Sequence, residues 1–173
     1  MRKAAAVIFL VTWCARLMAA ADQVTSLSEA EMRAAYLLNF ARFTTWPSSV
    51  AGPDSPLVLC AVDGSVAIAL ERTVVNRVIG TRPLLVRRIK GRDIPAECAL
   101  LYVEGPASPA SRHPASDALL TVGDGEQFAR SGGVIGIYLE NDRIRFAVNL
   151  AAAERAHLRL DVKLLNLARI IKD

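Results

Sequence analysis

The interpretation of this chain starts from the stretch Tyr36-Leu37-Leu38-Asn39-Phe40-Ala41-Arg42-Phe43-Thr44-Thr45-Trp46-Pro47. It holds four of the ten aromatic residues in a sequence of 173. One helical face carries Met32, Tyr36, Phe40 and Phe43, which follow one another at spacings of four, four and three residues. Proline cannot continue a helix and disfavours helical geometry in the residue before it. We therefore expect an amphipathic helix that ends at Trp46-Pro47.

The start of this helix is marked by Ser28-Glu29-Ala30-Glu31, which has the pattern of a capping box. The aromatic face of the helix has two interpretations. It is either part of the hydrophobic core or a docking face for a partner protein. In the second case the contact residues are Tyr36, Phe40, Phe43 and Trp46.

The N-terminus has the three parts of a secretory signal. Two basic residues come first, an apolar run from Ala4 to Trp13 follows, and three alanines end at Ala21. The apolar run is about half as long as a membrane-spanning helix requires. We predict a cleaved signal peptide at residues 1–21, a mature domain at residues 22–173 and a periplasmic location. Cys14 is expected to leave with the signal.

The length and charge of the mature chain limit its functions. Its 152 residues suffice for one domain of ordinary size. The formal charge of the whole chain is +4, but three basic residues lie in the predicted signal, which leaves +1. This small charge argues against nucleic-acid binding.

Apolar runs and helical segments alternate along the mature chain. Strands are predicted at Leu57–Val62, Pro83–Ile89, Cys98–Val103 and Ala118–Val122, and helices at Val66–Asn76, Glu126–Arg130, Ala151–Ala156 and from Asp161 onward. Asn149 is a candidate cap for the helix that follows it. This order predicts a single α/β domain with a mostly parallel central sheet and flanking helices.

An antiparallel hairpin is predicted at the edge of that sheet. Two strand-like runs, Val134–Glu140 and Arg143–Val148, flank the turn residues Asn141-Asp142. Arg143 and Arg145 alternate with apolar residues, so one face of the second strand is expected to be solvated. These two arginines are a second set of candidate partner-binding residues.

Catalytic and metal-binding residues are scarce, so we predict no enzyme, no cofactor and no metal. The histidines are His113, in a proline-rich segment, and His157, at a predicted helix end. His157, with Arg155 and Arg159, is a candidate for an anion site, although a solvated helix end explains His157 better. A second ligand candidate is a cleft at the strand ends near Asp63 and Asp124, where open α/β sheets bind ligands. A secreted hydrolase would need an acid/base pair among Asp63, Glu104, Asp124 and His113.

Four arginines are candidates for a basic patch that binds a nucleotide or an acidic surface. They are Arg42, Arg87, Arg88 and Arg92. Taken singly, each is better explained as an ordinary solvated surface residue.

The ordered motifs of the chain resemble the YfiR-like (HmsC-like) periplasmic family. The resemblance begins at Ala34–Pro47 and runs through nearly the whole mature chain. Its further segments are Leu57–Asp63, Cys98–Val103, Leu120–Asp124, Phe128–Ile135, Arg143–Asn149 and Leu164–Ala168.

The resemblance implies a function and a disulfide. Cys60 and Cys98 are the cysteines left after signal cleavage, a disulfide candidate in an oxidising compartment, and the family implies that they pair. The family also implies a repressor that docks on the periplasmic sensor domain of an inner-membrane diguanylate cyclase. Such a repressor lowers cyclic di-GMP and biofilm formation and is released by redox or envelope stress. A periplasmic small-ligand binding protein remains the alternative, and homodimerisation remains open.

Overall fold

A computed structural model describes residues 28–47, 55–90, 93–105 and 118–171. The predicted signal peptide, Arg92 and His113 lie outside these ranges, so their roles stay predictions.

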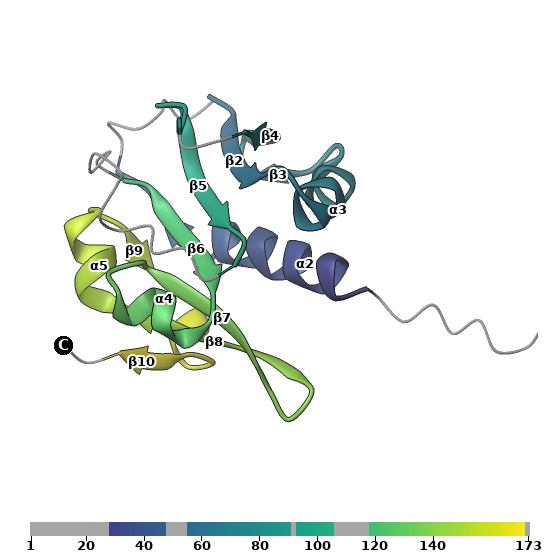
Figure 1. Cartoon of the computed structure of the whole chain (residues 1–173). Helices are drawn as coiled ribbons and strands as arrows, with labels where there is room; N and C mark the ends of the chain where they lie inside the picture. Colours follow the sequence, from purple (N-terminus) through teal and green to yellow (C-terminus); the bar gives the residue numbers. More distant parts are fainter. Residues whose placement is uncertain (1–27, 48–54, 91–92, 106–117, 172–173) are drawn as a thin grey trace, which may run out of the picture.

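An eight-stranded sheet forms the centre of the described domain, with the strand order β10-β8-β7-β6-β5-β2-β4-β3 (Figure 1). The strands are β2 (Leu57–Val62), β3 (Val78–Ile79), β4 (Arg82–Ile89), β5 (Cys98–Val103), β6 (Leu120–Asp124), β7 (Ile135–Glu140), β8 (Arg143–Asn149) and β10 (Arg169–Ile171). Neighbours from β4 to β7 are parallel, as are β8 and β10, whereas β7–β8 and β3–β4 are antiparallel. The predicted fold class is confirmed.

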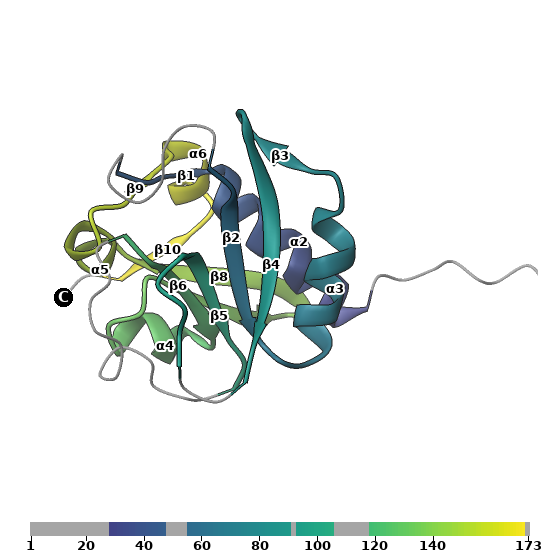
Figure 2. The same ribbon diagram turned by 90° about the horizontal axis from the view of Figure 1, so that it is seen from above.

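Helices cover both faces of this sheet (Figures 1 and 2). They are α2 (Glu29–Arg42), α3 (Ser65–Val74), α4 (Glu126–Arg130), α5 (Leu150–Arg155) and α6 (Val162–Leu165). The first two pack against one face, where the main core includes Leu37, Phe40 and Leu59. On the other face, α4 packs across β6, β7 and β8. A side chain at Gly123 or Gly133 would collide with the Phe128 ring of α4, so glycine is required at both positions.

The first helix begins as predicted and ends earlier than predicted. Ser28 forms the capping box with Glu31, whose carboxylate accepts from the Ser28 backbone amide at 2.7 Å. The helix ends at Arg42, not at Trp46-Pro47, because Thr44–Thr45 form strand β1. This strand pairs antiparallel with β9 (Arg159–Leu160), more than a hundred residues away in sequence.

The C-terminal helix is also shorter than predicted. A helix from Asp161 is correct only as far as Leu165, after which the chain turns and forms β10. Asp161 caps this short helix through the Lys163 amide. The residues beyond it form a strand because Ile170 and Ile171 pair with Val148 and Asn149 of β8.

The β7–β8 hairpin has the predicted antiparallel pairing and turn, and β10 extends the sheet beyond it by pairing with the last residues of β8. Glu140 pairs with Arg143 across Asn141 and Asp142. Both turn residues have positive φ angles, 52° and 57°, as the two-residue turns of twisted hairpins require. The predicted helix cap after the hairpin is also confirmed, since the Asn149 side chain caps α5 by accepting from the Ala152 amide at 2.8 Å.

Candidate functional site

The predicted disulfide is present between neighbouring central strands. Cys60 lies within β2 and Cys98 begins β5, with their Cα atoms 5.7 Å apart. The two side chains are 0% and 2% exposed and pack with Ile89, Leu101 and Leu119. A reductant therefore reaches the bridge only if this cluster opens.

The aromatic face of α2 is packed into the core. The Phe40 ring lies 5.0 Å from that of Phe146 and 5.9 Å from that of Tyr36. The Tyr36 hydroxyl donates to the Ile144 carbonyl at 3.4 Å, which joins the helix to β8. Of the two interpretations of this face, the structure agrees with the core. Phe40 is 0% exposed, so it offers no surface to a partner.

The remaining aromatic docking candidates are half-buried. Phe43 packs against the main core, and so does Trp46. The Trp46 indole N–H donates to the Ala99 carbonyl at 3.1 Å, which fixes the residue against β5. These contacts position the chain after α2 and leave part of each ring exposed.

The β7–β8 hairpin offers more accessible surface. Its tip extends beyond the body of the domain (Figure 1). Leu139 is 53% exposed, and both Arg143 and Arg145 are exposed. Arg145 lies 3.9 Å from Glu140 across the hairpin, a distance that gives at most a weak ion pair. We call Arg143 and Arg145, with Leu139 on the opposite face of the same tip, the hairpin surface.

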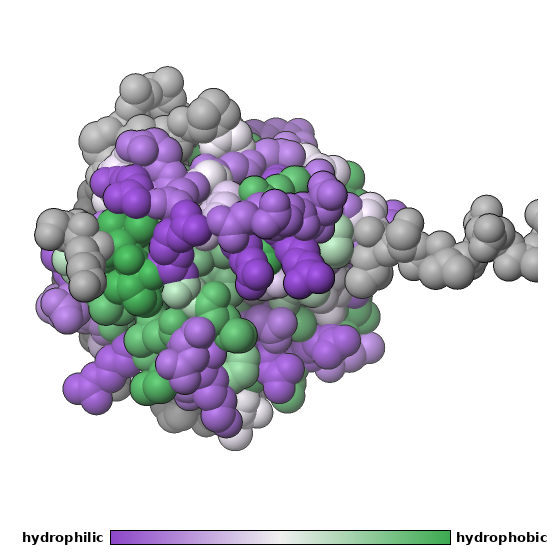
Figure 3. All heavy atoms as spheres, turned by 90° about the horizontal axis from the view of Figure 1, so that it is seen from below, coloured by the Kyte–Doolittle hydropathy of each residue, from purple (hydrophilic) through white to green (hydrophobic). Residues whose placement is uncertain are grey.

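Other exposed apolar side chains lie around α6. Val162 is 66% and Leu167 is 72% exposed. Seen from the side where the hairpin extends, the molecule has separate apolar patches between charged side chains (Figure 3). Exposed apolar patches of this kind are common at protein interaction sites.

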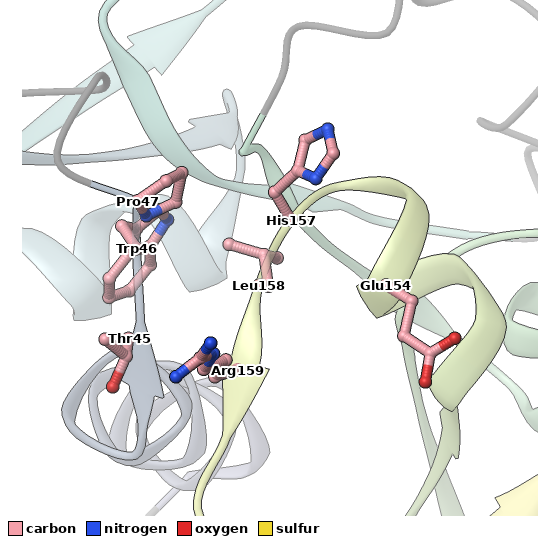
Figure 4. Close-up of a pocket in the computed structure, with 7 residues that line it drawn as sticks. All are labelled: Thr45, Trp46, Pro47, Glu154, His157, Leu158 and Arg159. Carbon is pink, nitrogen blue, oxygen red and sulfur yellow. The ribbon is translucent and has the colours of Figure 1, made fainter.

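A hollow of about 490 Å³ lies between the chain after α2 and the end of α5 (Figure 4). Among the described residues, those lining it are Thr45, Trp46, Pro47, Glu154, His157, Leu158 and Arg159. His157, a candidate ligand residue from the sequence, therefore lines this hollow. Arg155 does not line it, and Arg159 supplies the guanidinium there.

The position of His157 follows from the way α5 ends. Its amide donates to the Glu154 carbonyl, and the Leu158 amide donates to the Ala153 carbonyl, each at 2.9 Å. These are the two bonds of a Schellman motif, whose turning residue adopts a positive φ angle. His157 has φ 52° there, and the next residue, Leu158, is buried. The turn directs the His157 side chain away from the core.

The carboxylates at the strand ends form structural contacts. Asp124 accepts from the Tyr102 hydroxyl and the Gly105 amide, each at 2.8 Å, and lies 3.2 Å from Arg33. Burial raises the pKa of Tyr102, and the Asp124 carboxylate raises it further, so the hydroxyl stays a donor. Asp63 pairs with Arg88 at 3.3 Å. Asp124 is therefore committed to this network.

Sequence reasoning missed Arg33. Its side chain is 17% exposed, and it also pairs with Glu29 at 2.7 Å. The signal was present, because Arg33 precedes Leu37 and Phe40 at spacings of four and seven on the buried face of the helix. A charged residue on such a face requires a buried partner.

Within the described parts of the chain, no three histidine, cysteine, aspartate or glutamate side chains are grouped to hold a metal ion. No helix in those parts is long and apolar enough to cross a membrane.

The model of the YfiR/HmsC-like family matches residues 30–169. This range contains the contacts described above, except those made by Ser28, Glu29 and the last two residues of β10. The chain belongs to the YfiR/HmsC-like family. A search of curated proteins found no match.

Family membership sets the class of function. YfiR/HmsC-like proteins are periplasmic regulators of diguanylate cyclases and are not catalytic. In this YfiR/HmsC-like chain, the hairpin surface and the apolar residues near α6 are accessible for recognition, and the disulfide lies in the interior.

Proposed function

We propose that this protein represses an inner-membrane diguanylate cyclase by docking on the cyclase's periplasmic sensor domain. The family match over residues 30–169 is the observation that carries this proposal. Docking lowers cyclic di-GMP and thereby limits biofilm formation. Since a ligand shifts an equilibrium only by its differential affinity, the protein must bind the inactive conformation of the cyclase more tightly than the active one.

The hairpin surface is the docking surface that we propose. Its two exposed arginines, a residue type enriched at protein interfaces, lie on one face of the hairpin, and the exposed Leu139 lies on the other face because it pairs with Ile144. The aromatic face of α2 acts indirectly, since Tyr36 supports β8 from behind. Phe43 and Trp46 are half-buried, and their exposed parts are a minor contact for the cyclase in this proposal.

Arg143→Glu/Arg145→Glu tests this surface. Lys90→Glu is the matched control, because Lys90 is an exposed basic residue at the end of β4, outside the hairpin. The assay is cross-linking in intact cells followed by recovery of the tagged protein and measurement of cyclic di-GMP. We expect the double variant to lose the cyclase and raise cyclic di-GMP, while the control retains both properties.

The wild-type result tests the function itself. Failure of the wild-type protein to recover any membrane-bound cyclase would contradict repression by docking. Recovery of the cyclase by the hairpin variant at the wild-type level would keep repression and reject this surface.

The buried disulfide supports a structural role more than a redox switch. A switch requires a reductant to reach sulfurs that are at most 2% exposed in the folded protein. We therefore propose that cyclase recovery persists when cells are treated with a mild reductant. Loss of recovery with the fold intact, judged by circular dichroism, would instead support redox control.

A second candidate function is the binding of a small periplasmic ligand in the Trp46–His157 hollow. Its volume falls in the range of ligand sites, and it combines aromatic, apolar and cationic side chains. Native mass spectrometry of gently purified protein would detect such a ligand. Loss of the bound species in Trp46→Ala, with retention in Arg155→Ala, would support this site.

A further inference from the structure

The predicted basic patch divides in the structure. Arg87 pairs with Glu97, and Arg88 pairs with Asp63 and Glu71, all within 3.3 Å. These carboxylates neutralise the charge of both arginines. Arg92 lies outside the described residues. Arg42 is the member that remains without an acidic partner among the described residues.

A second arginine lies beside Arg42. A hollow of about 260 Å³ is lined by Leu38 and Arg42 from α2 and by Arg77 and Val78 from the start of β3. Figure 2 shows β3 on the same side of the molecule as the C-terminal end of α2. In the described parts of the chain, Arg77 has no ion pair either. The hollow is therefore lined by two positive charges and no negative one from these residues.

The backbone holds both arginines in place. Arg42 lies in the last turn of a helix whose Phe43 amide donates to the Asn39 carbonyl at 3.0 Å. The Arg77 amide donates to the Val74 carbonyl at 2.9 Å, and its carbonyl accepts from the Leu84 amide at 3.0 Å. The two side chains thus extend from fixed backbone positions, so that binding an anion between them has to order the side chains and not the backbone.

We propose that the hollow between Arg42 and Arg77 binds a phosphate group carried by a small ester. Two guanidinium groups on opposite sides of one phosphate group can donate to its oxygens from both sides, whether the phosphate is a monoester dianion or a diester monoanion. A single arginine fork already satisfies a planar carboxylate, so a second arginine favours phosphate. Leu38 and Val78 supply an apolar wall for the carbon part of the ester. This proposal does not depend on repression of a cyclase.

The phosphate group has two sources, a soluble phosphate ester or a lipid headgroup. Glycerol 3-phosphate is the soluble probe, and vesicles of phosphatidylglycerol, compared with phosphatidylcholine, test the lipid source. Acetate serves as the carboxylate control. All titrations use the complete oxidised protein at physiological ionic strength, since surface charge effects are exaggerated at low salt.

The readout is the set of arginine side-chain N–H resonances in a nitrogen-15-labelled sample. We expect glycerol 3-phosphate to shift the Arg42 and Arg77 signals in a saturable way. Arg42→Gln and Arg77→Gln should each weaken binding by at least about tenfold, because each removes charge-assisted hydrogen bonds. Arg155→Gln, an exposed arginine of α5, is the matched control and should leave the affinity unchanged.

Three results would overturn the proposal. The first is that neither the ester nor the phosphatidylglycerol vesicles bind. The second is that acetate produces the same shifts at the same concentration. The third is that Arg155→Gln weakens binding as much as the other two variants. Binding of the vesicles alone, abolished by Arg42→Gln, would assign the phosphate to a lipid headgroup. Variant spectra with native dispersion confirm that each protein is folded.

Discussion

The centre of the sheet and the tip of its edge hairpin are built differently. At the centre, β2 and β5 are joined by a buried disulfide, and Asp124 satisfies a buried tyrosine hydroxyl and an arginine. At the tip, Leu139 is mostly exposed, and Arg143 has no ion pair with any described residue. The difference indicates that the centre supplies stability, and the exposure of the tip supports our proposal that the tip takes part in recognition. Variants in the two regions should therefore affect different measurements.

The largest loss of stability is expected on removal of the disulfide. Cys60→Ala/Cys98→Ala releases a constraint on residues separated by 38 positions, which corresponds to about 4 kcal/mol on the chain-entropy model. Urea unfolding of the variant and the oxidised wild type measures this loss. A loss below about 1 kcal/mol would mean that the packing around the cysteines already holds β2 and β5 together.

The next largest loss is expected for Asp124→Asn. It removes the charge that pairs with the mostly buried Arg33, and because Arg33 keeps Glu29 as a partner we expect a loss of about 2 kcal/mol. The control is Asp63→Asn, whose pair with Arg88 is exposed and should contribute less than about 1 kcal/mol. Equal losses in the two variants, measured by urea unfolding, would remove the distinction between a buried network and a surface pair.

A smaller effect is expected between centre and tip, where Arg169 links Glu126 of α4 with Glu140 of β7 at 2.6 and 2.9 Å. Hydrogen bonds from Arg169 and Arg130 lower the pKa of Glu126. A lowered folded-state pKa stabilises the protein above the ordinary glutamate value, and this contribution is lost as the pH falls through the lowered value. Arg169→Met should raise the pKa of Glu126 toward its ordinary value.

Carbon-13 NMR titration of the glutamate carboxylates measures that shift. Lys163→Met is the control, since Lys163 belongs to α6 and makes no ion pair with a described acidic residue. An unchanged Glu126 titration in Arg169→Met would show that Arg130 alone holds the carboxylate charged.

The smallest effect on stability is expected at the tip. Arg143→Glu/Arg145→Glu changes two exposed side chains, so the free energy of unfolding should change by less than about 0.5 kcal/mol. Cyclase recovery from cells should nevertheless be lost. If Arg143→Glu/Arg145→Glu unfolds more readily than the wild type and still recovers the cyclase, the tip contributes to stability and not to recognition.

Local patterns in the sequence were sufficient to predict much of the fold. The runs Leu57–Val62 and Cys98–Val103 are strands with the predicted bounds, and Glu126–Arg130 is a helix with the predicted bounds. The Asn141-Asp142 turn and the Ser28 cap were also predicted correctly, because each depends on residues within a few positions.

The errors arose where distant residues decide the local structure. Thr44–Thr45 leave the helix because they pair with β9, and Arg169–Ile171 leave the predicted helix because they pair with β8. The Arg33–Asp124 contact joins elements separated by most of the domain. The candidate site contains one exception, a predicted disulfide whose cysteines are 38 positions apart. The Cys60–Cys98 pair was predicted, whereas the burial of Phe40 against Phe146 depended on which sheet face the helix covers.

The single bridge between β2 and β5 also bears on biogenesis. The full sequence has three cysteines and therefore three possible pairings, two of which use Cys14 in the predicted signal. Cleavage of the predicted signal at residues 1–21 would leave Cys60–Cys98 as the one intramolecular pairing, so an oxidase would suffice and an isomerase would have nothing to correct.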